Sequence, residues 1–256
     1  MDWFFIDQDY HKVDMTHGRN SIMTGMLASV SSLPEAQTAA AAGVDIIDFK
    51  NPLTGALGAL PPATLRTIKT MLDPSFTTSA TVGDLPMDPE LIHTAVAVMA
   101  ETGVDYVKVG LFDAPNLVDC IVALRPLCAS GVRIVCVLFA DENPDLDLLP
   151  QIAENGCVGV MLDTANKTSG GLPTCMTPAQ LADFVTRAHK LHLLTGLAGS
   201  LRAEDIPKLL PLRVDYLGFR GALCVDAART RNLSPAAVAR IRALIPRSSM
   251  ALRAVS

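Results

Sequence analysis

Short apolar runs alternate with longer segments of helical character eight times along this chain. The runs are rich in Val, Ile, Leu and Phe and mostly do not alternate with polar residues, which is typical of parallel strands covered on both faces. Parallel neighbours also need a crossover, usually a helix, between them. We therefore predict eight strands, over residues 26–30, 44–50, 76–82, 104–110, 132–140, 157–163, 192–197 and 214–220.

The segments between these runs carry the start and stop signals of helices. Pro or Asp stands at several starts, and a glycine follows several ends, as at Gly43, Gly103 and Gly131. Proline fits the first helical turn, and glycine adopts the left-handed conformation that ends a helix at little cost. We predict helices over residues 34–42, 62–72, 88–102, 115–130, 145–155, 178–191, 203–210 and 234–245.

Eight successive strand-then-helix units predict an α/β fold, a single (β/α)8 TIM barrel. The alternative is a doubly wound open sheet. No G-x-G-x-x-G sequence opens a helix after the first strand, which weakens the dinucleotide-binding form of that alternative. Residues 1–25 do not follow the pattern. They are either a short non-barrel N-terminal extension or lie upstream of the true start, and the catalytic barrel is expected over residues 26–256.

Composition excludes several classes of protein. Half of the 256 residues are hydrophobic, 18% are charged and the formal net charge is −5, so the chain is not intrinsically disordered and has no basic excess to meet nucleic acid. No apolar run approaches the roughly 18 residues of a membrane span, and the N-terminus lacks the features of a signal peptide. We expect a cytoplasmic protein with no membrane partner, and the low charge favours a homo-oligomer.

The cysteine and histidine pattern does not predict a metal site. The six cysteines include no C-x-x-C pair, and the histidines show no H-x-x-x-H spacing, whereas zinc sites need paired ligands. Cys136, Cys157 and Cys224 lie within or beside apolar runs. We predict that the cysteines are buried free thiols, which behave as small hydrophobic side chains.

Charged residues gather at the carboxyl ends of the predicted strands, where barrels of this kind carry their functional groups. Three of the seven lysines, Lys50, Lys108 and Lys167, lie at or just after the ends of even-numbered strands. Asp48 is two residues before Lys50, so both side chains lie on one face of the strand. Asp163 ends the sixth strand.

Such a set of lysines and carboxylates can perform Schiff-base chemistry. A lysine that is desolvated or crowded by other cations has its pKa lowered, and its free amine can attack a carbonyl. A neighbouring aspartate can then remove a carbon-bound proton, and further lysines can stabilise oxyanions. The structural alternative is a set of buried ion pairs, Asp48 with Lys50 or Lys108 and Asp163 with Lys167.

Two glycine-containing turns predict a phosphate site. Gly199-Ser200 follows the seventh predicted strand, and Arg220-Gly221 ends the eighth. The loops after these two strands frequently bind phosphate in TIM barrels, through backbone N–H groups and a helix N-terminus. We therefore expect a small phosphorylated substrate there.

Several strings in this sequence resemble one family. Asp48-Phe49-Lys50-Asn51-Pro52, followed by Gly55-Ala56-Leu57-Gly58-Ala59, is similar to the D-x-K-N-P…G-x-L-G-A signature of (5-formylfuran-3-yl)methyl phosphate synthases. The strings at residues 107–111, 161–167, 196–201 and 218–221 are similar as well. The resemblance covers about residues 26–245 in order. Residues 1–25 depart from the family, and Phe49 occupies a position that is more often Val.

The resemblance implies a (β/α)8 barrel enzyme, a lyase that acts early in methanofuran biosynthesis within one-carbon metabolism. Members condense two molecules of glyceraldehyde 3-phosphate, a phosphorylated triose, into a furan aldehyde phosphate with loss of phosphate and water, and no metal or organic cofactor is implied. By this likeness Lys50 forms the Schiff base and Asp48 is its acid/base partner. Lys108, Asp163 and Lys167 serve proton transfer and charge stabilisation.

Two other functions suit the same residues. A class I aldolase or an isomerase acting on another phosphorylated sugar would use the same lysines and phosphate loops. A non-catalytic barrel that binds a phosphorylated ligand would use the loops alone. Product identity distinguishes the first from a furan synthase, and borohydride reduction distinguishes the second, because a binding protein forms no imine.

Overall fold

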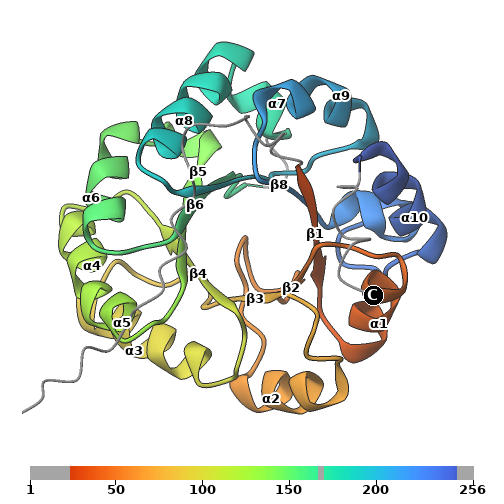
Figure 1. Ribbon diagram of the computed structural model, residues 1–256, viewed down its shortest axis with the longest axis horizontal. Coiled ribbons are helices and arrows are strands. Elements are labelled where there is room, and N and C mark those ends of the chain that lie inside the picture. Colours follow the sequence, from red (N-terminus) through yellow and green to blue (C-terminus); the bar gives the residue numbers. More distant parts are fainter. Residues whose placement is uncertain (1–23, 167–169, 247–256) are drawn as a thin grey trace, which may run out of the picture.

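The computed structural model describes residues 24–166 and 170–246. Eight parallel strands in chain order form a closed barrel, in which β1 (Gly25–Val30) pairs with both β2 (Ile46–Phe49) and β8 (Tyr216–Phe219). Figure 1 looks along the barrel and shows the helices as a ring around it. The predicted TIM barrel is confirmed, and the open doubly wound sheet is wrong.

The remaining strands are β3 (Thr78–Thr81), β4 (Tyr106–Leu111), β5 (Ile134–Phe139), β6 (Gly159–Asp163) and β7 (Leu194–Leu197). Each lies within or close to its predicted range, but seven of the eight begin two residues later than predicted. In three cases the residue just before the strand is an aspartate, namely Asp45, Asp105 and Asp215. Their carboxylates accept hydrogen bonds from the backbone N–H groups of Met26, Thr78 and Thr195, respectively.

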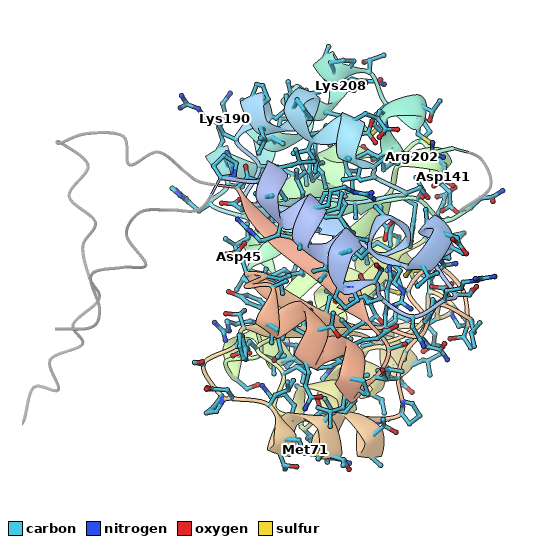
Figure 2. All side chains as sticks on the ribbon, turned by 90° about the vertical axis from the view of Figure 1, so that its right-hand side faces the viewer. Asp45, Met71, Asp141, Lys190, Arg202 and Lys208 are labelled. Atoms are coloured by element: carbon cyan, nitrogen blue, oxygen red, sulfur yellow. The ribbon has the colours of Figure 1, made fainter. Side chains whose placement is uncertain are left out.

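These three aspartates are structural groups at the amino ends of the strands. Each carboxylate joins its own strand to a neighbouring strand. In Figure 2, Asp45 lies toward one end of the barrel, and Asp141 and Arg202 lie toward the other. The amino end is therefore held by side chain to backbone hydrogen bonds, and the carboxyl end is left for the functional groups.

The helices are α1 (Leu33–Ala41), α2 (Pro62–Met71), α3 (Pro89–Ala100), α4 (Leu117–Ala123), α5 (Arg125–Ala129), α6 (Leu149–Glu154), α7 (Leu172–Cys175), α8 (Pro178–Lys190), α9 (Ile206–Leu209) and α10 (Pro235–Leu244). Every predicted helical range overlaps at least one of them. The range 115–130 is divided into α4 and α5, because Pro126 lacks the N–H that a continuous helix would use. The short helix α7 was not predicted.

Two apolar layers surround the strands. The larger layer lies between strands and helices and includes the buried Cys120, Cys136, Cys157 and Cys224. The smaller fills the barrel interior, with Leu27, Val137, Met161 and Tyr216 among its members. All six cysteines are free thiols and four are buried, so the prediction of buried thiols is correct for those four, whereas Cys128 and Cys175 are partly exposed.

Other predictions meet the structure only in part. The predicted extension, residues 1–25, lies outside the described residues except for Thr24 and Gly25, and Gly25 already belongs to β1. None of the helices that the structure describes has both the length and the apolar composition to cross a membrane. Exposed apolar side chains of α3 and α4, including Leu91, Val118 and Val122, are compatible with a homo-oligomer, which stays a prediction.

Candidate functional site

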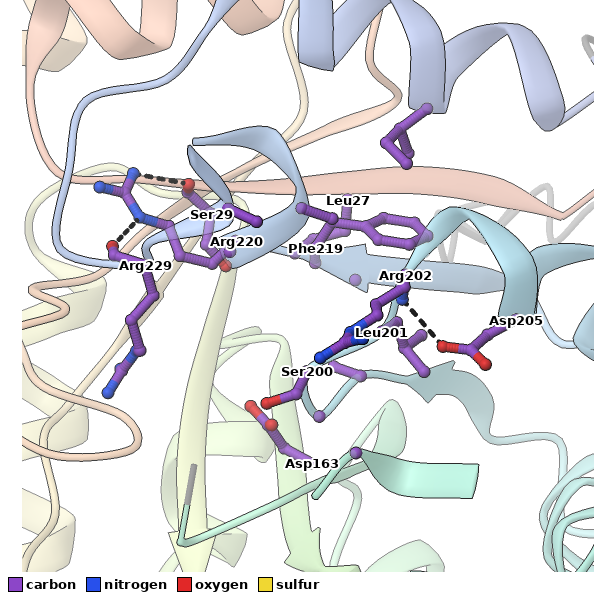
Figure 3. Close-up of a pocket in the computed structure, with 18 of the residues that line it drawn as sticks. Leu27, Ser29, Asp163, Ser200, Leu201, Arg202, Asp205, Phe219, Arg220 and Arg229 are labelled. Atoms are coloured by element: carbon purple, nitrogen blue, oxygen red, sulfur yellow. Dashed lines mark hydrogen bonds between the residues drawn. The ribbon is translucent and has the colours of Figure 1, made fainter. Parts of the chain in front are cut away.

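A cavity of about 980 Å³ lies at the carboxyl ends of the strands. Seven of the nine residues predicted to form the site line it, namely Lys50, Lys108, Asp163, Gly199, Ser200, Arg220 and Gly221. Figure 3 shows the part of the cavity around Asp163, Ser200 and Arg220. Asp48 lies just beneath the lining, and Lys167 lies outside the described residues. The strand-end prediction therefore brings distant residues together in one place.

Asp48 and Lys108 form a fully buried ion pair. Lys108 Nζ lies 2.6 Å from Asp48 Oδ1, and the hydroxyls of Ser29 and Ser79 donate to the same carboxylate at 2.8 and 2.7 Å. Ser29, Asp48 and Ser79 are direct neighbours across β1, β2 and β3. The sequence analysis missed the two serines, although alternate side chains of paired strands share a face.

Lys50 forms the second buried pair, across the barrel with Asp163 at the end of β6. The distance from Lys50 Nζ to Asp163 Oδ2 is 3.6 Å, and the side chains are 7% and 4% exposed. Lys50 Nζ also donates to the carbonyl of Ala56 at 3.3 Å. The ion pair of Asp48 is thus with Lys108, one of the two partners predicted for it. The Lys50–Asp163 pair was not predicted.

The environment shifts the proton affinities of the Asp48–Lys108 pair. Burial opposes ionisation of Asp48, but the charges of Lys108 and Lys50 outweigh it and hold the pKa of that carboxyl below its usual range. Burial and the charge of Lys50 lower the pKa of Lys108, although Asp48 acts in the opposite direction. Lys108 therefore gives up its proton more readily than an exposed lysine, whereas Asp48 stays ionised beside it.

Two further carboxylates hold the loops that carry these lysines and aspartates. Asp84, after β3, accepts hydrogen bonds from the N–H groups of Ala56 and Leu57, both at 2.7 Å. Asp141, after β5, accepts from Ala165 and Asn166, also at 2.7 Å. Odd-numbered strands thus supply carboxylates that fix the loops of even-numbered strands. Only their place after a strand could have drawn attention to them in the sequence.

Arg220 has a different role from the one its sequence position suggests. Its Nη1 and Nη2 donate to the two carboxylate oxygens of Glu35 on α1, at 2.6 and 3.2 Å. The other donors go to the carbonyls of Ser29, Arg229 and Arg231. All five guanidinium N–H groups are therefore used within the protein. The side chain fixes the loop after β8, so phosphate binding here would rest on backbone groups.

The backbone of the two predicted phosphate loops suits an anion. Gly199 and Ser200 have φ values of 103° and 51°, which turn the chain sharply after β7. A side chain at Gly199 would stand 2.9 Å from Thr164. Within the described part of the chain, the N–H groups of Ser200 and Gly221 make no hydrogen bond, and both residues line the cavity. Phosphate binding by these loops stays a prediction.

Metal ligands and histidines do not add to the site. Residues 24–166 and 170–246 contain no group of three or more His, Cys, Asp or Glu side chains that could hold a metal ion. His189 Nε2 lies 3.0 Å from Thr195 Oγ1 and 3.1 Å from Asp215 Oδ2. This cluster lies at the amino ends of β7 and β8, far from the cavity, so His189 is a structural residue as predicted.

Comparisons with known proteins agree with this geometry. Residues 26–242 match the family model described as 4-HFC-P synthase. The chain belongs to this family. It is 36% identical over 218 residues to the (5-formylfuran-3-yl)methyl phosphate synthase of Methanocaldococcus jannaschii. The alignment covers 81% of this chain and 93% of the relative. A relative in Methylorubrum extorquens, given the same name provisionally, is 42% identical over 84% of this chain and 88% of its own.

Solved structures with low identity share the fold. A 3-hexulose-6-phosphate synthase superposes with a TM-score of 0.61 at 19% identity, covering 86% of this chain and all of its own (100%). A 3-keto-L-gulonate-6-phosphate decarboxylase from Vibrio cholerae gives 0.61 at 14% identity, covering 88% and 100%. These likenesses show the barrel, whereas the relatives above show that this is an enzyme of the synthase family.

The buried Glu35–Arg220 pair gives a first prediction. Glu35→Gln leaves the Arg220 guanidinium buried beside a neutral partner, so the free energy of unfolding should fall by about 3–5 kcal/mol at pH 7. Burial works against the charged Glu35, but the Arg220 and Ser31 hydrogen bonds outweigh it and lower its pKa. The stabilisation is therefore present above the unfolded pKa of about 4.3 and disappears as the pH falls through the lower folded value.

Urea unfolding from pH 7 downward measures this effect. Glu101→Gln is the matched control, because Glu101 faces Arg66 in an exposed pair, with side chains 71% and 49% exposed. Its loss should be below about 1 kcal/mol. A loss of unfolding free energy for Glu35→Gln as small as that of the control would contradict the prediction.

The Asp48–Lys108 pair gives a second prediction, which separates its structural role from its chemical one. Lys108→Met leaves a buried carboxylate without its cation and should cost about 3–5 kcal/mol of unfolding free energy. Adding Asp48→Asn removes the orphaned charge and should restore most of that stability. Catalytic turnover should stay lost in the double variant. A double variant as unstable as Lys108→Met, or one with normal turnover, would contradict this assignment.

Proposed function

We propose that this protein condenses two molecules of glyceraldehyde 3-phosphate to (5-formylfuran-3-yl)methyl phosphate, through a Schiff base on Lys50, in methanofuran biosynthesis. Membership of the 4-HFC-P synthase family supports the product. The observation that supports the chemistry is a lysine amine at the wall of the cavity, beside a carboxylate at 3.6 Å and a second, buried lysine–aspartate pair.

The first step forms the imine. One molecule of glyceraldehyde 3-phosphate is first isomerised, through its enol, to dihydroxyacetone phosphate. The Lys50 amine adds to the carbonyl carbon of this triose, and the resulting carbinolamine loses water to give a protonated imine. Asp163 suits the proton transfers at this nitrogen, because its carboxylate lies 3.6 Å from Nζ. Asp163 also accepts the N–H of Thr164 at 2.7 Å, which fixes the orientation of the carboxylate.

The second step makes the carbon–carbon bond. A protonated imine acidifies the neighbouring C–H group, and a base removes that proton to give an enamine. Lys108 suits this role in its neutral amine form, which burial favours by lowering its pKa, and Lys108 lines the cavity. Asp48, which lies beneath it, would stabilise the resulting ammonium and act through Lys108. The enamine carbon then attacks the aldehyde of the second triose, and Lys167 is assigned to charge stabilisation.

The later steps close the atom balance. Two triose phosphates contain the atoms of one furan aldehyde phosphate, one inorganic phosphate and two water molecules. Dehydration removes hydroxyl groups as water, a C–O bond to phosphate breaks with the electron pair leaving on the phosphate, and a hydroxyl oxygen closes the ring. The imine is hydrolysed at the end, which regenerates the Lys50 amine. No external oxidant or reductant is needed, because the losses are only water and phosphate.

The loops after β7 and β8 are proposed to hold the phosphate of the triose bound to Lys50. Ser200 and Gly221 line the cavity, and glycine at 199 and 221 allows an anion to approach the backbone. Arg220 contributes by keeping the second loop in place rather than by direct contact. We expect no nucleic-acid partner, and the cytoplasmic location stays a prediction.

The third prediction tests the nucleophile. With glyceraldehyde 3-phosphate alone, the wild-type protein should give a product with the near-ultraviolet absorbance of a conjugated furan and the mass of a furan aldehyde phosphate. Borohydride should attach one reduced triose to the peptide that contains residue 50. Lys50→Ala and Lys50→Arg should lose both the product and the adduct, because alanine has no amine and a guanidinium does not form the imine.

Lys190→Ala is the control, since Lys190 is an exposed lysine at the end of α8, and it should keep product and adduct. Lys50→Arg preserves the positive charge opposite Asp163, which separates loss of the nucleophile from loss of stability. An aldol sugar as the product would favour the aldolase alternative. Normal turnover of Lys50→Arg would overturn the assignment of the Schiff base.

A further inference from the structure

A second arginine of the segment after β8 faces the cavity. Arg229 lines the cavity, is partly buried, and donates from Nη2 to the carbonyl of Gly55 at 3.0 Å. The next carbonyl of the same loop, that of Ala56, accepts from Lys50 Nζ. The guanidinium of Arg229 and the amine of Lys50 therefore lie on successive carbonyls of the loop after β2.

Arg229 differs from the other cations of this site in its partners. In the part of the chain that the structure describes, no carboxylate forms an ion pair with it, whereas Lys50, Lys108, Arg202 and Arg220 each have one. Arg240 also lines the cavity but is exposed. Arg229 is thus a half-buried cation with neither full hydration nor an anionic partner.

The side chain keeps most of its donors for a ligand. A guanidinium has five N–H groups, and one of those of Arg229 is used by Gly55. Figure 3 shows that its side chain extends away from the guanidinium of Arg220, while its backbone carbonyl accepts the hydrogen bond from Arg220 Nε. The backbone of Arg229 therefore serves the loop, and its side chain is available to the cavity. Burial lowers the pKa of Arg229, and the charge of Arg220 acts in the same direction, whereas the charges of Asp163 and Asp84 act in the opposite direction.

We infer that the Arg229 side chain binds the phosphate of the second triose, as an anion subsite distinct from the backbone N–H groups of Ser200 and Gly221. This inference rests on the proposed function, because joining two phosphorylated trioses brings two doubly charged phosphates into one cavity. The backbone N–H groups of Ser200 and Gly221 can bind one of them. A guanidinium fork matches phosphate oxygens in a bidentate manner, and this fork contacts the same loop as the amine to which the first triose is bound.

The position also fits the order of the chemistry. A second triose whose phosphate rests on Arg229 has its aldehyde within the same cavity as the enamine on Lys50. Repulsion between the two phosphates is reduced when each has its own cationic or N–H donor group. Arg229 would therefore set specificity for a phosphorylated second substrate, while Lys50 performs the covalent step.

The fourth prediction measures the stoichiometry of inorganic phosphate binding by calorimetry. The wild-type protein should bind two phosphates per chain, and Arg229→Gln should bind one with unchanged affinity while the other is weakened about 10- to 100-fold. Arg229→Lys should weaken the same phosphate less, because the charge remains and the fork is lost. Arg66→Gln, which removes a positive charge from the exposed pair with Glu101, should bind two phosphates like the wild type.

Kinetics supply a second readout. Arg229→Gln should raise the KM for glyceraldehyde 3-phosphate by a similar factor while still forming the borohydride adduct on Lys50, because the first triose does not need Arg229. A wild-type protein that binds one phosphate, or Arg229→Gln that binds two as tightly as the wild type, would overturn the inference.

The two hypotheses fail in different ways. If the wild type makes no furan but Arg229→Gln still loses one phosphate, the proposed function fails and the anion subsite stands. If the wild type makes the furan and Arg229→Gln matches it in phosphate stoichiometry and KM, the function stands and the subsite fails. The thermal midpoint of each variant shows whether a loss of binding reflects unfolding, and Arg229→Lys provides a folded comparison.

Discussion

Two buried ion pairs at the carboxyl end of the barrel constrain the rest of this structure. Four charges of alternating sign lie in a region from which water is largely excluded, and each would cost several kcal/mol if left alone. Lys108 on β4 pairs with Asp48 on β2, and Lys50, which follows β2, pairs with Asp163 of β6 across the barrel. Because no pair lies within one strand, the charges are compensated only when the strands adopt their final register.

The surrounding polar groups act on these charges through the backbone. Ser29 and Ser79 hold the Asp48 carboxylate, and Asp84 holds the loop whose Ala56 carbonyl contacts Lys50. The amino ends of the strands use aspartates in a similar way, as at Asp45. Carboxylates that accept hydrogen bonds from backbone N–H groups thus hold both ends of the barrel in place. The carboxylates paired with lysines are the ones proposed to take part in the reaction.

Sequence alone predicted the barrel and most of the site, because both depend on local patterns. The apolar runs and their helix signals set the strand order, and the barrel's geometry then places strand-end residues such as Lys50 and Asp163 together. The sequence left two partners open for Asp48 and missed the pairing of Lys50 with Asp163, because these pairings depend on the register between strands. Arg220 shows the same limit, since its pairing with Glu35 joins residues 185 positions apart.

That separation also affects how the protein is made. During synthesis Glu35 is exposed to water long before Arg220 exists, so the seam between the first and last β/α units cannot form on a growing chain. The loop after β8, which Arg220 organises and which carries Arg229, is therefore completed only after all eight strands have been synthesised. A nascent chain that stops before residue 220 contains all eight strands and the residues of both lysine–aspartate pairs, yet it cannot shape the anion-binding wall of the cavity.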